Sequence, residues 1–305
     1  MKFATFNVKN LYPSREVTPE LTQLFEDKLN WLAQRIARLD ADYIVLQEVG
    51  SLPALEEVVK RSGIAYQVFM ATPSKRGIAN AMLYKDTTTQ CESLLMRDLP
   101  FPVFQVGEVD AIGKHLSVNR SFVYARSIFT GKALHIFGIH LKSGFGMPIL
   151  DGEVEVPYTT HFGGGEATIR ALVNRLGEAQ ALRKKIDEIV AEDPHAQVIV
   201  AGDFNDRGPA ISCIQGSWEL LEVPGYLERA TNYTEPSDRY TFLSNNRNQE
   251  QLDHVLVTRN LYADIEQVTI YNKELRNHVD LEILMLPTVD SDHAPVEVVF
   301  RDEAN

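Results

Sequence analysis

Groups that could bind a metal ion or move a proton follow several short apolar runs along the chain. They are Asn7, Glu48, His140, Asp203, Asn205, Asp253, Asp292 and His293. Carboxylate and amide oxygens are ligands that Mg²⁺ and Mn²⁺ prefer, while Asp and His can transfer protons or contact phosphate. Because a rigid sheet can hold such groups near solvent at its strand ends, we expect these segments to meet in one acidic metal and phosphate site.

Two of these segments show what the pattern predicts and what else it could mean. Glu48 follows Tyr-Ile-Val-Leu-Gln, so it is either a metal ligand at the mouth of a buried strand or a solvated charge. Asp203 and Asn205 would face the same way if the extended backbone continued through them. Asp203 could then deprotonate a water while Asn205 donates to a phosphate oxygen. The alternative is an Asx-turn, which both residue types favour.

The histidines need an orienting acceptor before they can do chemistry. Asp253, just before the apolar run at 255–257, could supply it for His293. His140 ends the run at 134–139 and is followed by Lys142 and Ser143, although a single histidine at a strand end is more often structural. His254 is left open. The other five histidines are interpreted as structural: His115, His135, His161, His195 and His278.

The elements that must position these groups can be predicted from periodicity. Thr18 and Pro19 indicate a helix start, and apolar spacing extends the helix over residues 19–39, with further helices at 53–61 and 166–191. Strand-like runs lie at 2–7, 43–46, 65–70, 79–84, 90–95, 121–128, 133–140, 198–201, 252–257, 264–270 and 295–300. Residues 143–165 are glycine-rich and predict a long surface loop. No linker divides the chain, so we expect one domain, 1–305.

Composition limits the classes of function. The chain has 305 residues, 44% of them hydrophobic, and a formal net charge of −12, which disfavours non-specific binding to duplex DNA unless a local basic rim or a bound cation reverses the sign. Two cysteines imply no disulfide framework. No signal segment and no apolar run near 18 residues is present, so we expect a cytoplasmic protein without stable membrane association. Phosphate-loop, zinc-peptidase and serine-hydrolase motifs are absent.

Six segments together resemble the endonuclease/exonuclease/phosphatase superfamily, and they occur in the order that is typical of it. They are Thr5-Phe6-Asn7-Val8, Gln47-Glu48, His140-Leu141-Lys142-Ser143, Gly202-Asp203-Phe204-Asn205, Leu252-Asp253-His254-Val255 and Ser291-Asp292-His293-Ala294-Pro295. The resemblance implies a DNase I-like α/β fold, a four-layer α/β/β/α sandwich of two mixed sheets with helices outside. It also implies hydrolysis of a phosphoester with a divalent metal, Mg²⁺ or Mn²⁺.

The same resemblance implies a metal site. Glu48 would bind the metal with Asn7 beside it, and Asp292 would complete the acidic cluster. Members that act at apurinic sites have an Asp two residues after the Asn of the first segment, where this chain has Lys9. A lysine would not bind a metal there but could reach a phosphate, which makes an apurinic-site nuclease a weaker prediction.

Catalytic roles also follow from the resemblance. Asp203 would orient or deprotonate the attacking water, and Asn205 would hold the phosphate. His293, oriented by Asp253, would contact the phosphate. His140 would stabilise the phosphate or the leaving group.

The substrate is predicted less directly, because substrate choice depends on loops. Candidate phosphate contacts are Lys9, Arg76, Arg120, Lys142, Ser143 and Arg170. The leading hypothesis is a nuclease or phosphodiesterase that cleaves nucleic acid. The alternative is a small-molecule or lipid phosphodiesterase or phosphatase, similar to sphingomyelinases or phosphoinositide phosphatases. A non-catalytic binding module is a third, less favoured reading. The sequence does not indicate DNA or RNA, endo- or exo-cleavage, one metal or two, or the oligomeric state.

Overall fold

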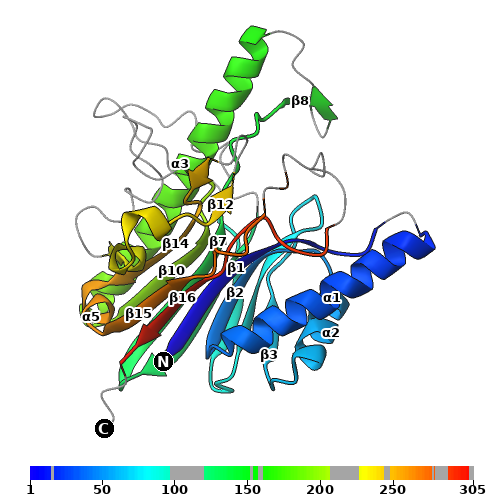
Figure 1. Cartoon of the computed structure of the whole chain (residues 1–305). Helices are drawn as coiled ribbons and strands as arrows, with labels where there is room; N and C mark the ends of the chain where they lie inside the picture. The colour runs from blue at the N-terminus through cyan, green and yellow to red at the C-terminus, as the bar shows by residue number, and fades with distance from the viewer. Residues whose placement is uncertain are drawn as a thin grey trace, which may run out of the picture.

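Two six-stranded mixed sheets lie face to face in the computed structural model of this chain, with helices on both outer sides (Figure 1). The structure describes residues 1–14, 17–96, 120–151, 154–156, 161–206, 227–243, 248–276, 278 and 288–301. The predicted fold class, an α/β/β/α sandwich, is confirmed. His115 and Cys213 lie outside the described residues, and Cys91 is a free thiol.

The first sheet has the order β15-β16-β1-β2-β4-β3. Its strands are β15 (Ile265–Ile270), β16 (Val296–Phe300), β1 (Lys2–Leu11), β2 (Tyr43–Val49), β4 (Ala79–Tyr84) and β3 (Gln67–Met70). Strands β1 and β2 are parallel, and the other neighbouring pairs are antiparallel. The helices α1 (Pro19–Leu39) and α2 (Leu52–Ser62) cover its outer face.

The second sheet has the order β11-β14-β10-β7-β6-β5. Its strands are β11 (Leu227–Arg229), β14 (Asp253–Thr258), β10 (Gln197–Asp203), β7 (Lys132–His140), β6 (Phe122–Phe129) and β5 (Gln90–Leu94). Strands β7 and β10 are parallel. The helix α3 (His161–Glu192) covers the outer face of this sheet. Smaller elements are β8 (Ile149–Asp151), β9 (Val154–Val156), β12 (Phe242–Leu243), β13 (Gln249–Glu250), α5 (Arg259–Tyr262), η2 (Ala230–Tyr233) and η3 (Pro236–Asp238).

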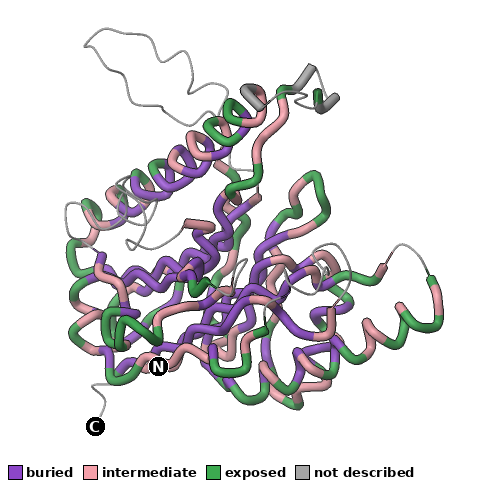
Figure 2. Tube along the Cα trace, turned by 45° about the horizontal axis from the view of Figure 1, so that its top comes forward, coloured by how far each residue is buried: buried purple, intermediate pink, exposed green. Residues whose placement is uncertain are grey.

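The core between the sheets fixes how they stack. Val45 of β2 and Ile136 of β7 are fully buried there, in one apolar cluster. The sheets approach so closely at Gly138 that a Cβ atom on it would lie 2.5 Å from Val45 Cγ1. Figure 2 shows buried backbone through both sheets, with exposed positions on the outward faces of the helices. The packed sheets therefore form a rigid support for the groups at their strand ends.

The helix α1 has the predicted bounds because local signals fix both ends. Thr18 Oγ1 accepts a hydrogen bond from Leu21 N at 3.2 Å, and Pro19 occupies the first turn. The C-cap residue Asp40 takes a left-handed φ of 41°. Burial of Leu32 and Ile36 then holds the helix on the first sheet.

The prediction of one long loop over residues 143–165 is wrong. The segment contains the hairpin of β8 and β9, and α3 begins at His161, ahead of the predicted 166. Met147 N donates to Ala167 O at 2.8 Å, and Arg170 Nε donates to Met147 O at 2.9 Å. These contacts fasten the segment to α3, whereas its glycines, which are weak helix formers, gave no helical signal in the sequence.

The carboxyl ends of β1, β2, β7 and β10 lie on one side of the sheet stack (Figure 1). Parallel pairing puts the ends of β1 and β2 together, and likewise those of β7 and β10. Because the two pairs occupy central positions in facing sheets, groups from both sheets can meet there. This edge is the candidate site.

Candidate active site

The side chain of Asn7 joins the two sheets at this edge. Its Nδ2 atom donates to Glu48 Oε1 at 3.2 Å and to Asp203 Oδ2 at 3.0 Å. Asn7 is fully buried, and its backbone oxygen accepts from Ser291 Oγ at 2.7 Å. Glu48, Asp203 and Ser291, from three other recognised segments, therefore all bond to Asn7.

Left-handed backbone conformations at the strand ends set the directions of the side chains in the site. Lys9, Asn10, Glu48 and Asn205 have φ values of 47°, 55°, 63° and 51°. The pairing of β1 with β2 shifts register between Asn7 and Leu11, which is a bulge. Local hydrogen bonds compensate the strain: Lys9 N donates to Asn7 Oδ1 at 3.0 Å, and Asn10 N donates to Glu48 Oε2 at 3.1 Å. Bulges and left-handed residues of this kind re-aim side chains at functional sites.

His293 is oriented by Asp253, as the sequence predicts. Its Nδ1 atom lies 2.7 Å from Asp253 Oδ2, and its backbone N donates to Ser291 Oγ at 3.1 Å. Asp253 is itself held by Thr241, whose Oγ1 accepts from Asp253 N at 3.0 Å. The imidazole is therefore fixed with Nε2 toward Asp203, at 3.9 Å from Oδ2.

Burial and the neighbouring charges shift the pKa values of His293 and Asp203 in ways that set their protonation states. Burial alone would lower the pKa of His293, but the carboxylates of Asp253, Asp203 and Asp292 raise it to about 10. Burial raises the pKa of Asp203 to about 7, with Asp253 and Glu48 adding to the rise and the charge of His293 opposing it. The site thus places a charged imidazolium next to a carboxylate that can take up a proton near neutral pH.

His140 supplies a neutral imidazole on the other side of Asp203. Burial, with the charges of Arg120, His293 and Lys142, lowers its pKa well below the ordinary value. Its Nε2 atom lies 3.4 Å from Asp203 Oδ2. His140 Nδ1 and Asp253 Oδ1 are buried and have no hydrogen-bond partner among the described residues. Such atoms at a site are places where water or substrate atoms can bind.

The extended backbone does not continue through Asn205, and of the two alternatives for Asp203 and Asn205 the Asx-turn is the one that forms. Asn205 N donates to Asp203 Oδ1 at 2.8 Å, and Asn205 Nδ2 donates to Leu141 O at 3.1 Å. The left-handed backbone at Asn205 turns the chain away after β10. Gly202 prepares this turn with φ of 145°, where a Cβ atom would lie 1.9 Å from Ile139 O. Asn205 Nδ2 carries two hydrogens, and the hydrogen bond to Leu141 O uses only one of them.

The third predicted member of the acidic cluster, Asp292, is paired with a lysine. Its Oδ2 atom lies 3.0 Å from Lys9 Nζ, which is also 2.6 Å from His278 Nδ1. Burial raises the pKa of Asp292, but the positive charges of His293 and Lys9 outweigh it and leave the pKa below its ordinary value. The carboxylate of Asp292 is therefore already paired with the ammonium group of Lys9.

The donor chemistry of the site fits a divalent ion at Glu48. Among the residues that the structure describes, no three His, Cys, Asp or Glu side chains cluster as a ready ligand set. Glu48 is only partly buried and offers a hard carboxylate at the mouth of the site. Mg²⁺ commonly uses one or two carboxylates and keeps several waters, so one accessible carboxylate is compatible with it.

The predicted phosphate contacts differ in what holds their side chains. Lys142 Nζ donates to Ser143 O at 2.8 Å and to Phe145 O at 2.7 Å, so Lys142 and Ser143 organise their own loop, as Arg170 does through Met147. Arg120 Nη1 donates to His140 O at 3.4 Å. Burial lowers the pKa of Arg120 below its ordinary value, and the charges of Glu48, Glu178 and Asp203 oppose this shift only in part. Arg76 is exposed.

His254 and His135 have structural surroundings. His254 is buried against Phe204, with ring centroids 5.1 Å apart, and burial lowers its pKa to about 3. His135 bonds the hydroxyl of Tyr124 at 2.7 Å. The open interpretation of His254 is thereby resolved as structural.

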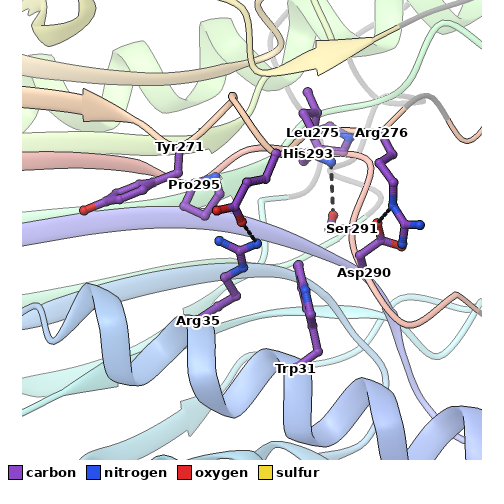
Figure 3. Close-up of a pocket in the computed structure, with 10 residues that line it drawn as sticks. Trp31, Arg35, Tyr271, Leu275, Arg276, Asp290, Ser291, His293 and Pro295 are labelled. Carbon is purple, nitrogen blue, oxygen red and sulfur yellow. Dashed lines mark hydrogen bonds and ion pairs between the residues drawn. The ribbon is translucent and has the colours of Figure 1, made fainter.

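A pocket of about 200 Å³ lies beside the site, between α1 and the segments that flank β15 and β16 (Figure 3). It is lined by Trp31, Arg35, Tyr271, Glu274, Leu275, Arg276, Asp290, Ser291, His293 and Pro295. Sequence reasoning missed Trp31, Tyr271 and Thr241 as neighbours of the site. Ser291 belongs to the segment Ser291–Pro295, so the sequence could have identified it, whereas no sequence motif marks Thr241.

Comparison with known proteins identifies the class to which this fold and site belong. The chain belongs to the Endonuclease/Exonuclease/phosphatase family, whose model matches residues 4–293. Members of this family are phosphoester hydrolases. A search of curated proteins found no match.

Solved structures at low sequence identity share this fold. Truncated Caenorhabditis elegans TDP2 is 14% identical, with 98% of this chain and 96% of that chain covered and a TM-score of 0.60. Bacteroides thetaiotaomicron mannosyl-6-phosphatase is 16% identical over 99% of both chains, with a TM-score of 0.60. Danio rerio TDP2, solved with a single-strand DNA product, is 17% identical over 99% and 98%, with a TM-score of 0.59. These likenesses establish the fold.

Proposed function

We propose that this chain is a divalent-metal-dependent phosphoester hydrolase that cleaves nucleic acid, as a nuclease or phosphodiesterase. The supporting observation is the position of Asp203 Oδ2. It lies 3.0 Å from Asn7 Nδ2 and 3.4 Å from His140 Nε2. It also lies 3.9 Å from Nε2 of the charged His293. A carboxylate surrounded by donors in this way can take a proton from water beside a bound phosphate.

In the proposed reaction the oxygen of a water forms a bond to phosphorus while the bond from phosphorus to the leaving oxygen breaks. Asp203 accepts the proton of the water. The imidazolium of His293, held by Asp253, donates to a phosphate oxygen, and neutral His140 offers a second donor. The leaving oxygen takes its proton from solvent. Fixed donors of this kind typically contribute about 10²–10³ in rate each.

Glu48 would hold the divalent ion, Mg²⁺ or Mn²⁺, with Asn7 fixing the carboxylate. When bound, such an ion stabilises the negative charge that develops on phosphate oxygens. Asn7 contributes by keeping Glu48 and Asp203 apart at a constant distance, since it donates to both.

Nucleic acid is the favoured substrate because exposed positive charge lies near an otherwise acidic site. Arg76 is exposed, and its positive charge lowers the pKa of both Arg120 and Lys142. Burial is the larger cause of both shifts. A similar fold binds a single-strand DNA product in Danio rerio TDP2. Backbone phosphates on either side of the cleaved bond would be attracted to this positive charge.

A second candidate is a phosphatase for a small sugar phosphate. The pocket beside His293 favours it, because Trp31, Tyr271 and the ion-paired Arg35 line a space of about 200 Å³. The same fold carries mannosyl-6-phosphatase activity in the Bacteroides protein. The pocket is smaller than the roughly 300–1,000 Å³ of typical ligand clefts, so it suits a fragment the size of one sugar.

A substrate panel tests both candidates. Single-stranded DNA, plasmid, RNA, bis-p-nitrophenyl phosphate and p-nitrophenyl phosphate are each incubated with Mg²⁺, Mn²⁺ or EDTA. The nuclease proposal expects cleavage of nucleic acid and of the diester with metal, and none with EDTA. Turnover of the monoester alone would support the phosphatase. No hydrolysis of any substrate would contradict both and favour a binding module.

A further inference from the structure

The ammonium group of Lys9 occupies a buried position inside the acidic site. Lys9 Nζ lies 3.0 Å from Asp292 Oδ2 and 2.6 Å from His278 Nδ1. The side chains of Lys9 and Asp292 are only 8% and 14% exposed. An ion pair so far removed from water is screened little, and breaking it by removing one partner leaves a costly uncompensated charge.

The backbone is built to hold Lys9 in this position. Lys9 has a φ of 47° inside the bulge of β1, and its N donates to Asn7 Oδ1 at 3.0 Å. A left-handed backbone is unusual for a lysine and needs support from its surroundings. The bulge therefore directs a cation inward, toward Asp292, from a strand end whose neighbour Asn7 faces Glu48.

A second layer of charged groups holds the partners of Lys9. His278 Nε2 lies 3.2 Å from Asp290 Oδ1, and Asp290 Oδ2 accepts from Arg276 Nε at 2.6 Å. Lys28 Nζ donates to the backbone oxygens of Thr288 at 3.2 Å and Asp290 at 3.4 Å. The segment that carries Asp292 is thus tied to α1 and to His278 by contacts that do not involve the phosphate site.

We propose that Lys9 is a built-in cation that occupies the place beside Asp292 where a second divalent ion would otherwise bind. The site then binds one metal ion, at Glu48, and Asp292 acts as the counter-ion of Lys9 rather than as a metal ligand. This inference rests on the proposed metal-dependent function. Its physical basis is that an ammonium 3.0 Å from a carboxylate satisfies that charge and repels a dication.

Direct measurement of Mn²⁺ binding to the full chain tests this inference without turnover. Electron paramagnetic resonance titration and calorimetry would give the number and affinity of bound ions. We expect one ion for the wild-type chain, a loss of affinity above about tenfold in Glu48→Gln and a change below about threefold in Asp292→Asn. Lys9→Met should bind a second ion, because Asp292 loses its cation.

Two further variants serve as controls. Lys9→Met with Asp292→Asn removes both charges together and should return the count to one ion. Lys9→Arg keeps the charge and should also bind one ion. Circular dichroism and the thermal midpoint check the fold. If Lys9→Met alone fails to fold, the Asp292→Asn, double-variant and Lys9→Arg measurements still decide the question.

The opposing outcomes are separable. Two ions in the wild-type chain, an Asp292→Asn loss as large as that of Glu48→Gln, or a single ion in folded Lys9→Met would overturn the role of Lys9 and leave the hydrolase proposal standing. No Mn²⁺ binding in the wild-type chain would overturn both.

Discussion

Asn7 and Asp203 lie in different sheets, 196 residues apart in sequence, and a hydrogen bond of 3.0 Å joins their side chains. The stacking of the sheets thereby sets the geometry of the site directly. Both residues are buried, and Asn7 also donates to Glu48. A small shift of one sheet against the other would separate the proposed metal carboxylate from the proposed base.

Replacing Asn7 should therefore impair chemistry more than folding. In Asn7→Ala, Glu48 and Asp203 lose their shared donor and face each other with unshielded charge. We expect kcat to fall about 10²-fold with KM changed less, since the lost donor acts on the reacting groups. Steady-state kinetics on bis-p-nitrophenyl phosphate measure the effect. Asn260→Ala on α5, which removes an amide that donates to His195 O away from the site, is the matched control and should keep wild-type kcat.

Gly202 should tolerate no side chain. A Cβ atom there would lie 1.9 Å from Ile139 O, and its φ of 145° disfavours residues other than glycine. Gly202→Ala must separate β10 from β7, and we expect a loss of about 3 kcal/mol in the free energy of unfolding. Chemical denaturation measures it. Gly144→Ala, where a Cβ atom meets nothing within 4 Å, is the control, and equal loss in both variants would contradict the steric argument.

The stability of the protein should depend on pH through Asp86. A hydrogen bond from Ser127 at 2.6 Å, opposed by burial and assisted by Thr88, lowers the pKa of Asp86 to about 2. A carboxylate with a depressed pKa stabilises the fold above its unfolded value of about 3.9, and that contribution disappears as pH falls toward about 2. Asp86→Asn should cost about 1–2 kcal/mol at pH 7 and almost nothing near pH 2.

Denaturation of wild type and Asp86→Asn across this pH range measures the difference. In the background Ser127→Ala the pH-dependent part should shrink, because the main donor to Asp86 is gone. A constant difference at all pH values would show that the substitution acts by another route.

Nucleic-acid binding should depend on Arg76. Exposed arginine near the site would contact a backbone phosphate, so Arg76→Ala should weaken binding to single-stranded DNA and reduce the slope of log affinity against log salt by about 0.7. Fluorescence anisotropy at several salt concentrations measures it. Lys60→Ala on α2, whose ammonium pairs with Glu57, is the control. Equal slopes in wild type and Arg76→Ala would remove Arg76 from the substrate path.

Much of the fold follows from local sequence signals. The bounds of α1 could be predicted because Thr18, Pro19 and the leucine spacing are all local. The start of α3 could not, since its first turns contain glycines and are fastened by contacts with Met147. The single-domain organisation of residues 1–305 stays a prediction.

The residues of the candidate site could be predicted from the sequence, but their arrangement could be predicted only in part. Asp253 and His293 pair as expected, with Asp253 at the start of β14 and His293 just before β16. The turn at Asn205 and the pairing of Lys9 with Asp292 depend on a left-handed backbone and on a bulge, which spacing does not reveal. At these positions the local conformation departs from what sequence patterns predict, as is common at functional sites.

Turnover of bis-p-nitrophenyl phosphate and single-stranded DNA by Asp203→Asn and His293→Ala, with Mg²⁺ or Mn²⁺ and with the fold verified by circular dichroism, tests the central claim most directly. If Asp203 takes the proton and His293 holds the phosphate, each folded variant should lose at least about 10²–10³ of wild-type kcat. Wild-type-like turnover in either variant would contradict the assignment of these residues to catalysis.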